Sequence, residues 1–185
     1  SKISEVDFEN LTFGNVFTDH MLVCDYVDGA WQKPVIEPYA PFMIDPSAKV
    51  FHYGQAIFEG MKAYKDQQDD VWLFRPDENF HRFNKSATRM AMPEVPEDIF
   101  LGGLHRLLEI EKEWVKKGKG NTLYIRPFMI ATGHGVIAAP SQEYRFMIIL
   151  SPARAYYSGE VKVIIAEHYS RAANGGIGAA KAAGN

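Results

Sequence analysis

Hydrophobic and polar residues alternate through the first third of the chain in a pattern typical of β-strands. Residues 20–27 and 31–37 are two such runs, and the Asp-Gly pair between them is a strong signal for a hairpin turn. Residues 61–64 and 71–74 form a second pair of strand-like runs around a polar stretch. The intervening segment 51–60 is compatible with a short helix or with a loop, because its periodicity favours neither.

The middle of the chain has the spacing of amphipathic helices. A first helix is predicted over residues 76–92, because Pro76 and the two acidic residues after it favour a helix start and apolar residues then recur every three or four positions. A second helix is predicted from about Pro96 to Trp114, and the lysine- and glycine-rich segment 116–120 ends it.

Strand-like runs return after the second helix. We expect strands over residues 122–130, 144–150 and 161–166. The segment 152–159 separates the last two of these runs and contains proline, serine and glycine, which makes it the best candidate for a linker. Strands and helices are segregated along the sequence, and this arrangement predicts an α+β fold.

The linker candidate divides the chain into two unequal parts. We expect an N-terminal α+β domain over residues 1–152, an interdomain linker over residues 153–160, and the beginning of a second domain over residues 161–185. The length of 185 residues fits this division, because a typical domain has about 150 residues.

Composition then narrows the class of protein. The 20 basic and 23 acidic residues give a formal net charge of −3, which offers no electrostatic footprint for nucleic acid. No uncharged apolar run approaches the ~18 residues of a membrane span, and the first residues lack the apolar core of a secretion signal. A single cysteine, Cys24, and scattered histidines predict neither a disulfide nor a metal site. We therefore expect a soluble cytoplasmic protein.

The segment from Asn174 to Asn185 is rich in glycine and alanine and surrounds one lysine, Lys181. Its Gly176-Ile-Gly178 sequence loosely matches a pyrophosphate-binding turn, although that turn should follow a strand directly and begin a helix. A lysine framed by small residues also suits Schiff-base catalysis, because a planar ring can approach its backbone closely. A flexible tail with one solvated lysine is the third interpretation.

Several arginines lie in apolar or aromatic settings, where a guanidinium is suited to bind phosphate or carboxylate: Arg75, Arg82, Arg126 and Arg171. Tyr124 and Arg126 are two positions apart on a predicted strand, so their side chains share one face. Together they are compatible with a carboxylate site or with the polar side of an amphipathic strand.

Two other residue classes carry less information. Ser86 and Ser151 lack the sequence context of a catalytic nucleophile. Most aromatic residues are predicted to belong to the hydrophobic core. Four of them occur in glycine-containing stretches and are candidates to line a pocket: Phe13, Phe17, Tyr53 and Phe58.

Five segments, taken in order, are more specific together than any one alone. They are Phe13-Gly-Asn-Val-Phe-Thr-Asp-His-Met21, His52-Tyr-Gly-Gln-Ala-Ile-Phe-Glu-Gly-Met-Lys-Ala63, Leu73-Phe-Arg-Pro76 with Arg82, Leu123-Tyr-Ile-Arg-Pro127, and Gly175-Gly-Ile-Gly-Ala-Ala-Lys-Ala-Ala-Gly-Asn185. With these segments the chain resembles the branched-chain amino acid aminotransferases, which are fold-type-IV pyridoxal-phosphate enzymes. The resemblance runs from about Phe13 to Asn185.

The resemblance implies a role for several of these residues. Lys181 matches the lysine that forms the internal aldimine, or Schiff base, with pyridoxal 5′-phosphate and later carries a proton between Cα and C4′. Arg82 matches the arginine that binds the cofactor phosphate, and Arg171 matches an arginine near the cofactor. Tyr124 and Arg126 match a substrate-binding pair in which the arginine helps to hold the side-chain carboxylate of glutamate.

Four aromatic residues match positions that line the pocket for the substrate side chain: Tyr53, Phe58, Phe13 and Tyr156. In homodimers of this family the tyrosine at position 53 is expected to reach the neighbouring subunit's site. The loop over residues 131–138 departs from many relatives, which carry an acidic residue and a proline there. This departure leaves the side-chain preference of the pocket open.

The same resemblance implies the fold and the reaction. It implies a two-layer α/β sandwich as the N-terminal domain, followed by the start of a larger β-rich, pseudo-barrel cofactor domain. The sequence stops four residues after Lys181, so we expect a truncated chain in which the later cofactor-binding groups are absent. The full-length enzyme is expected to transfer an amino group from leucine, isoleucine or valine to 2-oxoglutarate, and the fragment alone to be inactive.

Two alternatives remain open at this point. A D-amino acid aminotransferase or an aminodeoxychorismate lyase, both of fold type IV, would keep the lysine but differ around Phe13, Tyr53 and Arg126. For the fragment alone, a binding or dimerisation module is the alternative that is not an enzyme.

Overall fold

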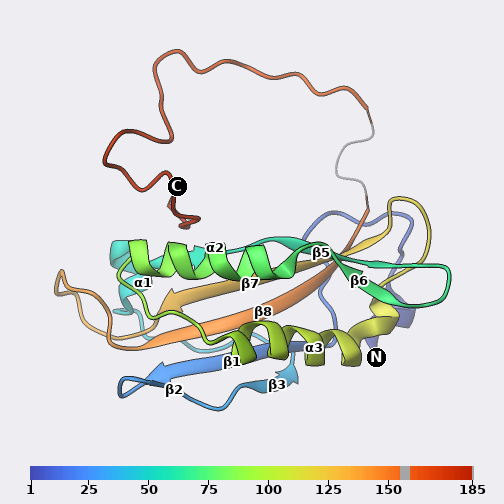
Figure 1. Ribbon diagram of the computed structural model, residues 1–185, viewed down its shortest axis with the longest axis horizontal. Helices are drawn as coiled ribbons and strands as arrows, with labels where there is room; N and C mark the ends of the chain where they lie inside the picture. Colours follow the sequence, from blue (N-terminus) through green and yellow to red (C-terminus); the bar gives the residue numbers. More distant parts are fainter. Residues whose placement is uncertain (155–158, 185) are drawn as a thin grey trace.

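The computed structural model describes residues 1–154 and 159–184, and its elements follow the predicted order of strands, helices and strands (Figure 1). The strands are β1 (His20–Val27), β2 (Ala30–Trp31), β3 (Val35–Pro38), β4 (Ala56–Phe58), β5 (Met61–Lys65), β6 (Val71–Leu73), β7 (Thr122–Ala131) and β8 (Tyr144–Ala153). The α-helices are α1 (Lys49–Tyr53), α2 (Pro76–Arg89) and α3 (Gly103–Glu111). A π-helical segment over Asp98–Gly102 leads into α3, and short 3₁₀ turns cover Lys2–Glu5 and Lys112–Trp114.

Within the described residues, eight strands form one antiparallel sheet in the order β2-β1-β8-β7-β5-β6, with β3 paired to β1 and β4 paired to β7. Strands β7 and β8 pair along their whole length, from Thr122 opposite Ala153 to Ala131 opposite Tyr144. The predicted Asp-Gly turn joins β1 and β2. Both of its residues have positive φ, which matches the right-handed twist of a hairpin.

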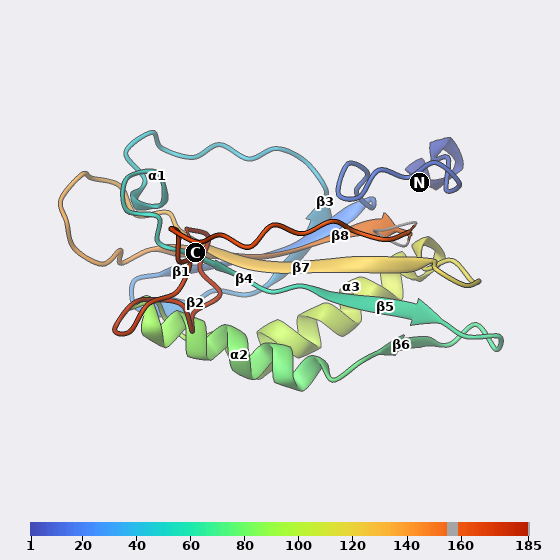
Figure 2. The same cartoon turned by 90° about the horizontal axis from the view of Figure 1, so that it is seen from above.

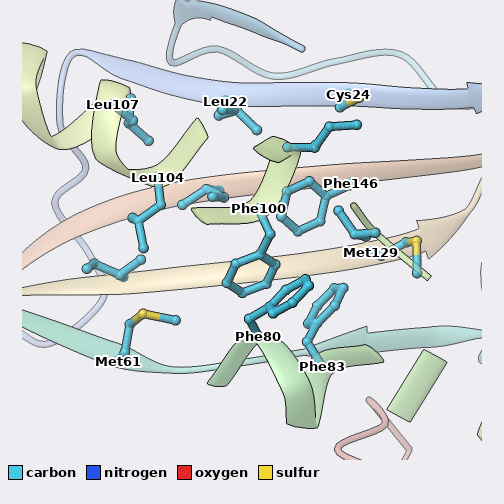
Figure 3. Packing of buried hydrophobic residues seen from close by; sticks show 14 of the residues in the cluster. Leu22, Cys24, Met61, Phe80, Phe83, Phe100, Leu104, Leu107, Met129 and Phe146 are labelled. Atoms are coloured by element: carbon cyan, nitrogen blue, oxygen red, sulfur yellow. The ribbon is translucent and has the colours of Figure 1, made fainter. Parts of the chain in front are cut away.

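Helices α2 and α3 cover the same face of the sheet (Figure 2). Their apolar sides meet the sheet in a core that contains stacked and edge-on phenylalanine rings (Figure 3). The Phe100 ring centroid lies 5.3 Å from that of Phe83 and 5.5 Å from that of Phe146. The π-helical segment, α2 and β8 therefore meet at this point. The predicted two-layer α+β architecture is therefore confirmed.

Alternation along β7 decides which residues are available for chemistry. Leu123, Ile125 and Met129 are fully buried toward the helices. Tyr124 and Arg126 occupy the intervening positions, so they point to the opposite face of the sheet. The predicted common face of these two side chains is confirmed, and it is the face that α2 and α3 do not cover.

Four local predictions need correction. The run 31–37 is not one strand, because β2 covers Ala30–Trp31 and β3 covers Val35–Pro38. Segment 51–60 is neither a helix nor a loop alone, because it contains the end of α1 and all of β4. The first helix ends at Arg89 rather than at residue 92, where Ala91 turns to positive φ. The predicted strand over residues 161–166 is wrong: its side chains are exposed and no described residue pairs with it. Its hydrophobicity is strand-like, but a strand also needs a neighbour to accept its backbone hydrogen bonds.

Candidate functional site

The segment around Lys181 returns to the sheet and docks beside β4 (Figures 1 and 2). The Phe58 N–H donates to the Lys181 carbonyl at 3.0 Å, and the Ala183 N–H donates to the Ala56 carbonyl at 3.0 Å. These two bonds make a short antiparallel bridge in which Ile57 faces Ala182. The lysine is therefore held by main-chain contacts and does not lie in a solvated tail.

Small residues in this segment are required by packing. A Cβ placed on Gly178 would come within 2.4 Å of the Ala172 Cβ, closer than real Cβ atoms approach. Ala180 and Ala182 are almost fully buried. Gly176 and Gly178 lie in turns, and the described residues after them form a bridge rather than a helix. This local structure does not match a dinucleotide-binding turn, which would open a helix.

Phe58 is the common neighbour of two cationic side chains. The Lys181 Nζ lies 4.4 Å from the centroid of its ring, and the Arg126 Cζ lies 4.6 Å from the same centroid. Arg126 also donates from Nη2 to the Tyr124 hydroxyl at 2.7 Å, and the Tyr124 ring packs edge-on against Phe13 at 4.9 Å. The structure thus brings together five residues that the sequence singled out from four separate segments.

Arg126 has hydrogen-bonding capacity that its described neighbours do not use. Its Nε is buried, and within the described parts of the chain this atom has no hydrogen-bond partner. A buried donor without an acceptor is costly, so such a group favours the binding of an acceptor from outside the protein. A carboxylate matches the guanidinium best, because it can accept from two of its N–H groups at once.

Arg82 is anchored by a residue that the sequence analysis did not assign. Its Nε and Nη2 donate to the two oxygens of Glu59 at 2.5 and 2.8 Å. Glu59 is fully buried and also accepts from the Asn79 side chain at 2.7 Å and from the Gly60 N–H at 3.2 Å. The hydrogen bond and the charge of Glu59 raise the pKa of Arg82, so this guanidinium remains a permanent cation.

The Phe-Glu-Gly motif therefore has a structural reason at each position. Phe58 supplies the ring beside the two cations, and Glu59 fixes Arg82. Gly60 makes room for the side chain of Tyr124, because a Cβ there would lie 2.4 Å from the Tyr124 hydroxyl oxygen. The only sequence signal for Glu59 was an acidic residue inside an otherwise apolar and glycine-containing run.

Lys181 and Arg82 line the same small cavity. It has a volume of about 250 Å³ and is lined by Phe58, Arg82, Arg171 and the segment from Gly178 to Ala182, which includes Lys181. Two guanidinium groups and one amine therefore share a cavity in which all of the charged lining residues are cationic. Such a cavity is suited to an anionic ligand that also carries a group able to react with an amine.

Three predicted residues are not part of this cluster, and a fourth lies outside the described residues. Phe17 stacks on Tyr39, with 4.7 Å between the ring centroids. Tyr53 is partly exposed on α1, and its hydroxyl donates to the carbonyl of Val136 in the loop before β8. Arg75 forms a surface ion pair with Glu78 at 3.1 Å. Tyr156 lies outside the described residues. The role predicted for Tyr53 needs a second subunit, so its position away from the cluster does not contradict that prediction.

Other kinds of site find no support in the described residues. No group of three or more histidine, cysteine, aspartate or glutamate side chains in residues 1–154 and 159–184 is arranged to hold a metal ion. None of the helices in the same residues combines the length and apolarity that crossing a bilayer requires.

Comparison with known proteins gives a consistent result. No family model matches the chain. The branched-chain-amino-acid transaminase 1 of Bacillus subtilis is 50% identical over 184 residues, which cover 97% of this chain and 52% of the relative. The chain spans about half the length of the curated relatives it matches.

Solved structures show the same fold at much lower identity. The branched-chain aminotransferase of Thermoproteus uzoniensis, solved with norvaline, matches 72% of this chain and 41% of its own chain, with a TM-score of 0.54 and 19% identity. An aminotransferase from Brucella abortus, solved with bound PLP, matches 88% of this chain and 53% of its own, with a TM-score of 0.56 and 17% identity. By sequence, this chain is therefore similar to the branched-chain-amino-acid aminotransferases over about half the length of those enzymes, and its fold is the one seen in these solved aminotransferase structures.

Proposed function

We propose that the whole protein containing this chain is a pyridoxal-phosphate-dependent aminotransferase. In this proposal it transfers the amino group of leucine, isoleucine or valine to 2-oxoglutarate. The observation that carries the proposal is the cavity in which the amine of Lys181 and the guanidinium of Arg82 lie beside the Phe58 ring. The choice of substrates is supported by the names of the relatives that are about 50% identical to this chain.

The cavity fits the chemical groups of the cofactor. Arg82 is held from one side by Glu59 while more than half of its side chain remains exposed, so it can bind a phosphate without losing its anchor. Arg171 lines the same cavity and adds a second positive charge. When bound, pyridoxal phosphate supplies an electron sink that stabilises negative charge at the substrate Cα. Lys181 supplies the amine to which the cofactor aldehyde is attached.

The residues of this chain then have separate tasks. The Lys181 Nζ would take the proton from the substrate Cα and deliver it to C4′ of the cofactor. Arg126 and Tyr124 bind the side-chain carboxylate of glutamate or 2-oxoglutarate, which satisfies the buried Arg126 Nε. Phe13 and Phe58 provide apolar contacts for a branched aliphatic side chain. One pocket can thus accept both substrates, because the Arg126 guanidinium keeps its hydrogen bond to the Tyr124 hydroxyl when an aliphatic side chain is bound.

We also propose a cytoplasmic homodimer. Exposed apolar side chains gather on α1 and on the loop before β8, where Phe51, Val136 and Ile137 are each at least 60% exposed. Tyr53 lies in the same region and is tied to that loop, so a partner subunit docked there would be close to it. In this arrangement Tyr53 lines the side-chain pocket of the partner subunit.

The division of the chain is part of the same proposal. Residues 1–152 form the N-terminal domain, residues 153–160 the linker, and residues 161–185 the first part of the cofactor domain. The end of β8 at Ala153, the last strand named among the described residues, supports a boundary close to residue 152.

The decisive test is covalent attachment of the cofactor to Lys181. The whole protein is incubated with pyridoxal phosphate, reduced with borohydride and digested, and the modified lysine is located by mass spectrometry. We expect modification at Lys181, and we expect Lys181→Ala to abolish both the modification and amino transfer from leucine to 2-oxoglutarate. Lys162→Ala, in an exposed part of the same segment, is the matched control and should retain both.

A substrate panel tests the rest of the proposal. L-leucine, L-isoleucine and L-valine should react with 2-oxoglutarate as acceptor, whereas D-alanine and aminodeoxychorismate should not. Normal turnover by Lys181→Ala, or a preference for the D-amino acid, would contradict the assignment.

A further inference from the structure

Both backbone polar groups of Lys181 are bonded, and they are bonded to different elements. Its carbonyl accepts from the Phe58 N–H of β4 at 3.0 Å, and its N–H donates to the Ser86 hydroxyl of α2 at 3.0 Å. Ser86 is almost fully buried. The main chain of Lys181 is therefore fixed from two directions, and this fixes the direction in which its side chain leaves the backbone.

The Ser86 hydroxyl has two partners. It donates to the Arg82 carbonyl one turn earlier at 2.9 Å, as helix serines commonly do, and it accepts from Lys181 with its lone pair. The side chain of Arg82 in turn holds Glu59, which follows Phe58 in the sequence. The contacts close into a ring through Lys181, Phe58, Glu59, Arg82 and Ser86, which includes the main chain of Lys181 and the guanidinium of Arg82.

We propose that Ser86 is a positioning residue for the cofactor site: it sets the placement of Lys181 relative to Arg82. This inference rests on the proposed function, because it assigns a task in cofactor attachment. Lys181 and Arg82 lie 99 positions apart in the sequence. Ser86 is the described residue that touches the main chain of both, so a shift of α2 would move the amine and the guanidinium together.

The chain offers a matched control on the same helix. Thr88 makes the same kind of bond one turn back, from its hydroxyl to the Asn84 carbonyl at 3.1 Å. The single proton of this hydroxyl is shared with a second acceptor, the Glu94 carboxylate at 2.7 Å, on the exposed side of the helix. Thr88→Ala therefore removes a helix hydroxyl of the same type without touching the segment that carries Lys181.

The experiment compares wild type, Ser86→Ala, Ser86→Thr and Thr88→Ala in the whole protein. The first readout is hydrogen exchange at the Lys181 amide without cofactor. We expect exchange to be roughly tenfold faster in Ser86→Ala, because the amide loses its acceptor, and unchanged in Thr88→Ala. The second readout is the dissociation constant for pyridoxal phosphate, expected to rise roughly five- to tenfold in Ser86→Ala only.

The third readout separates positioning from a general loss of structure. If Ser86 places the amine, Ser86→Ala lowers kcat while KM for 2-oxoglutarate stays within twofold, since Arg126 and Tyr124 are untouched. Ser86→Thr keeps the hydroxyl oxygen and should restore most of the cofactor affinity. This variant also keeps the proposal testable where Ser86→Ala does not fold.

Two results would overturn the inference. One is unchanged amide exchange and cofactor affinity in Ser86→Ala, and the other is an equal effect of Thr88→Ala. Failure of the proposed function looks different: wild type would then show no cofactor attachment at Lys181, whereas the exchange difference between Ser86→Ala and Thr88→Ala would persist.

Discussion

Glu59 is the most deeply buried charge next to the site, and it determines what Arg82 can do. The pair joins a fully buried carboxylate to a guanidinium that is 55% exposed. A buried charge is tolerated when its lone pairs are satisfied, and Glu59 accepts from Arg82, Asn79 and the Gly60 N–H. The Nε and Nη2 groups of Arg82 are thus bound to Glu59, and the remaining N–H groups of the guanidinium can bind a ligand.

This arrangement gives a prediction at the residue scale. Glu59→Gln keeps the size of the side chain but removes its charge and replaces one acceptor oxygen with a donor. We expect the free energy of unfolding to fall by about 1–3 kcal/mol, since Arg82 loses its bidentate partner. We also expect a lower affinity for pyridoxal phosphate. Urea denaturation and cofactor titration measure the two effects.

The control for this substitution is Glu78→Gln, which breaks the exposed pair with Arg75. Exposed pairs of this kind contribute about 0–1 kcal/mol, so the control should change stability little and cofactor affinity not at all. If both variants weaken cofactor binding equally, the special role of Glu59 is refuted.

At the scale of elements, Asp19 ties the N-terminal 3₁₀ turn to the start of β1 and to Trp114 after α3. It accepts from the Ser1 hydroxyl at 2.5 Å, the Lys2 N–H at 2.7 Å and the Trp114 indole at 3.0 Å. Burial by itself would raise the pKa of Asp19, but these hydrogen bonds outweigh it and lower the pKa from 3.8 to about 2.

The sign of this shift predicts an acid-sensitive contact. Because the folded protein holds the proton less tightly than the unfolded chain, the stabilisation is complete above pH 4 or so and is lost as the pH falls toward 2. We expect Asp19→Asn to lower the melting temperature at pH 6 by about 2–4 °C, a contribution of about 1 kcal/mol after allowance for solvent screening. Near pH 2.5 the difference should shrink; a constant difference across this range would contradict the assignment.

Helices and hairpins were predictable because their signals are local. The Asp-Gly turn, the proline and acidic residues at the start of α2, and the alternation of β7 each lie within a few neighbouring positions. Segment 161–166 has the same local strand signal but forms no strand, since pairing depends on a partner elsewhere in the chain. Local patterns therefore predict elements well and their pairing poorly.

The site divides in the same way. Lys181, Arg126 and Tyr124 could be singled out because their residue types suit chemistry, and the family resemblance then supplied the role predicted for each. Ser86 and Glu59 were not assigned, because their partners lie 95 and 23 positions away and only the fold brings them together. The sequence thus identified side chains suited to contact a ligand, whereas those that hold them in place required the structure.

At the scale of the whole molecule, an exposed apolar region on α1 and the loop before β8 has no role within the described part of the chain itself. Phe51, Val136 and Ile137 project from it, while the buried Lys49 donates from Nζ to the carbonyls of Ile137 and Ala139 and so fixes the loop. Exposed apolar side chains on a fixed surface are typical of a protein interface. We therefore place the dimer contact of the proposed enzyme on this surface.

Val136→Asp tests this placement in the whole protein. A charge buried at an interface without a partner is strongly unfavourable, so the dimer should dissociate at least tenfold more readily in sedimentation equilibrium. Val35→Asp, at a comparably exposed position on β3, is the control and should leave the association unchanged. Because Tyr53 is proposed to line the partner subunit's pocket, loss of the dimer should also reduce turnover of branched-chain substrates. A dimer that survives Val136→Asp with unchanged affinity would place the interface on another face of the molecule.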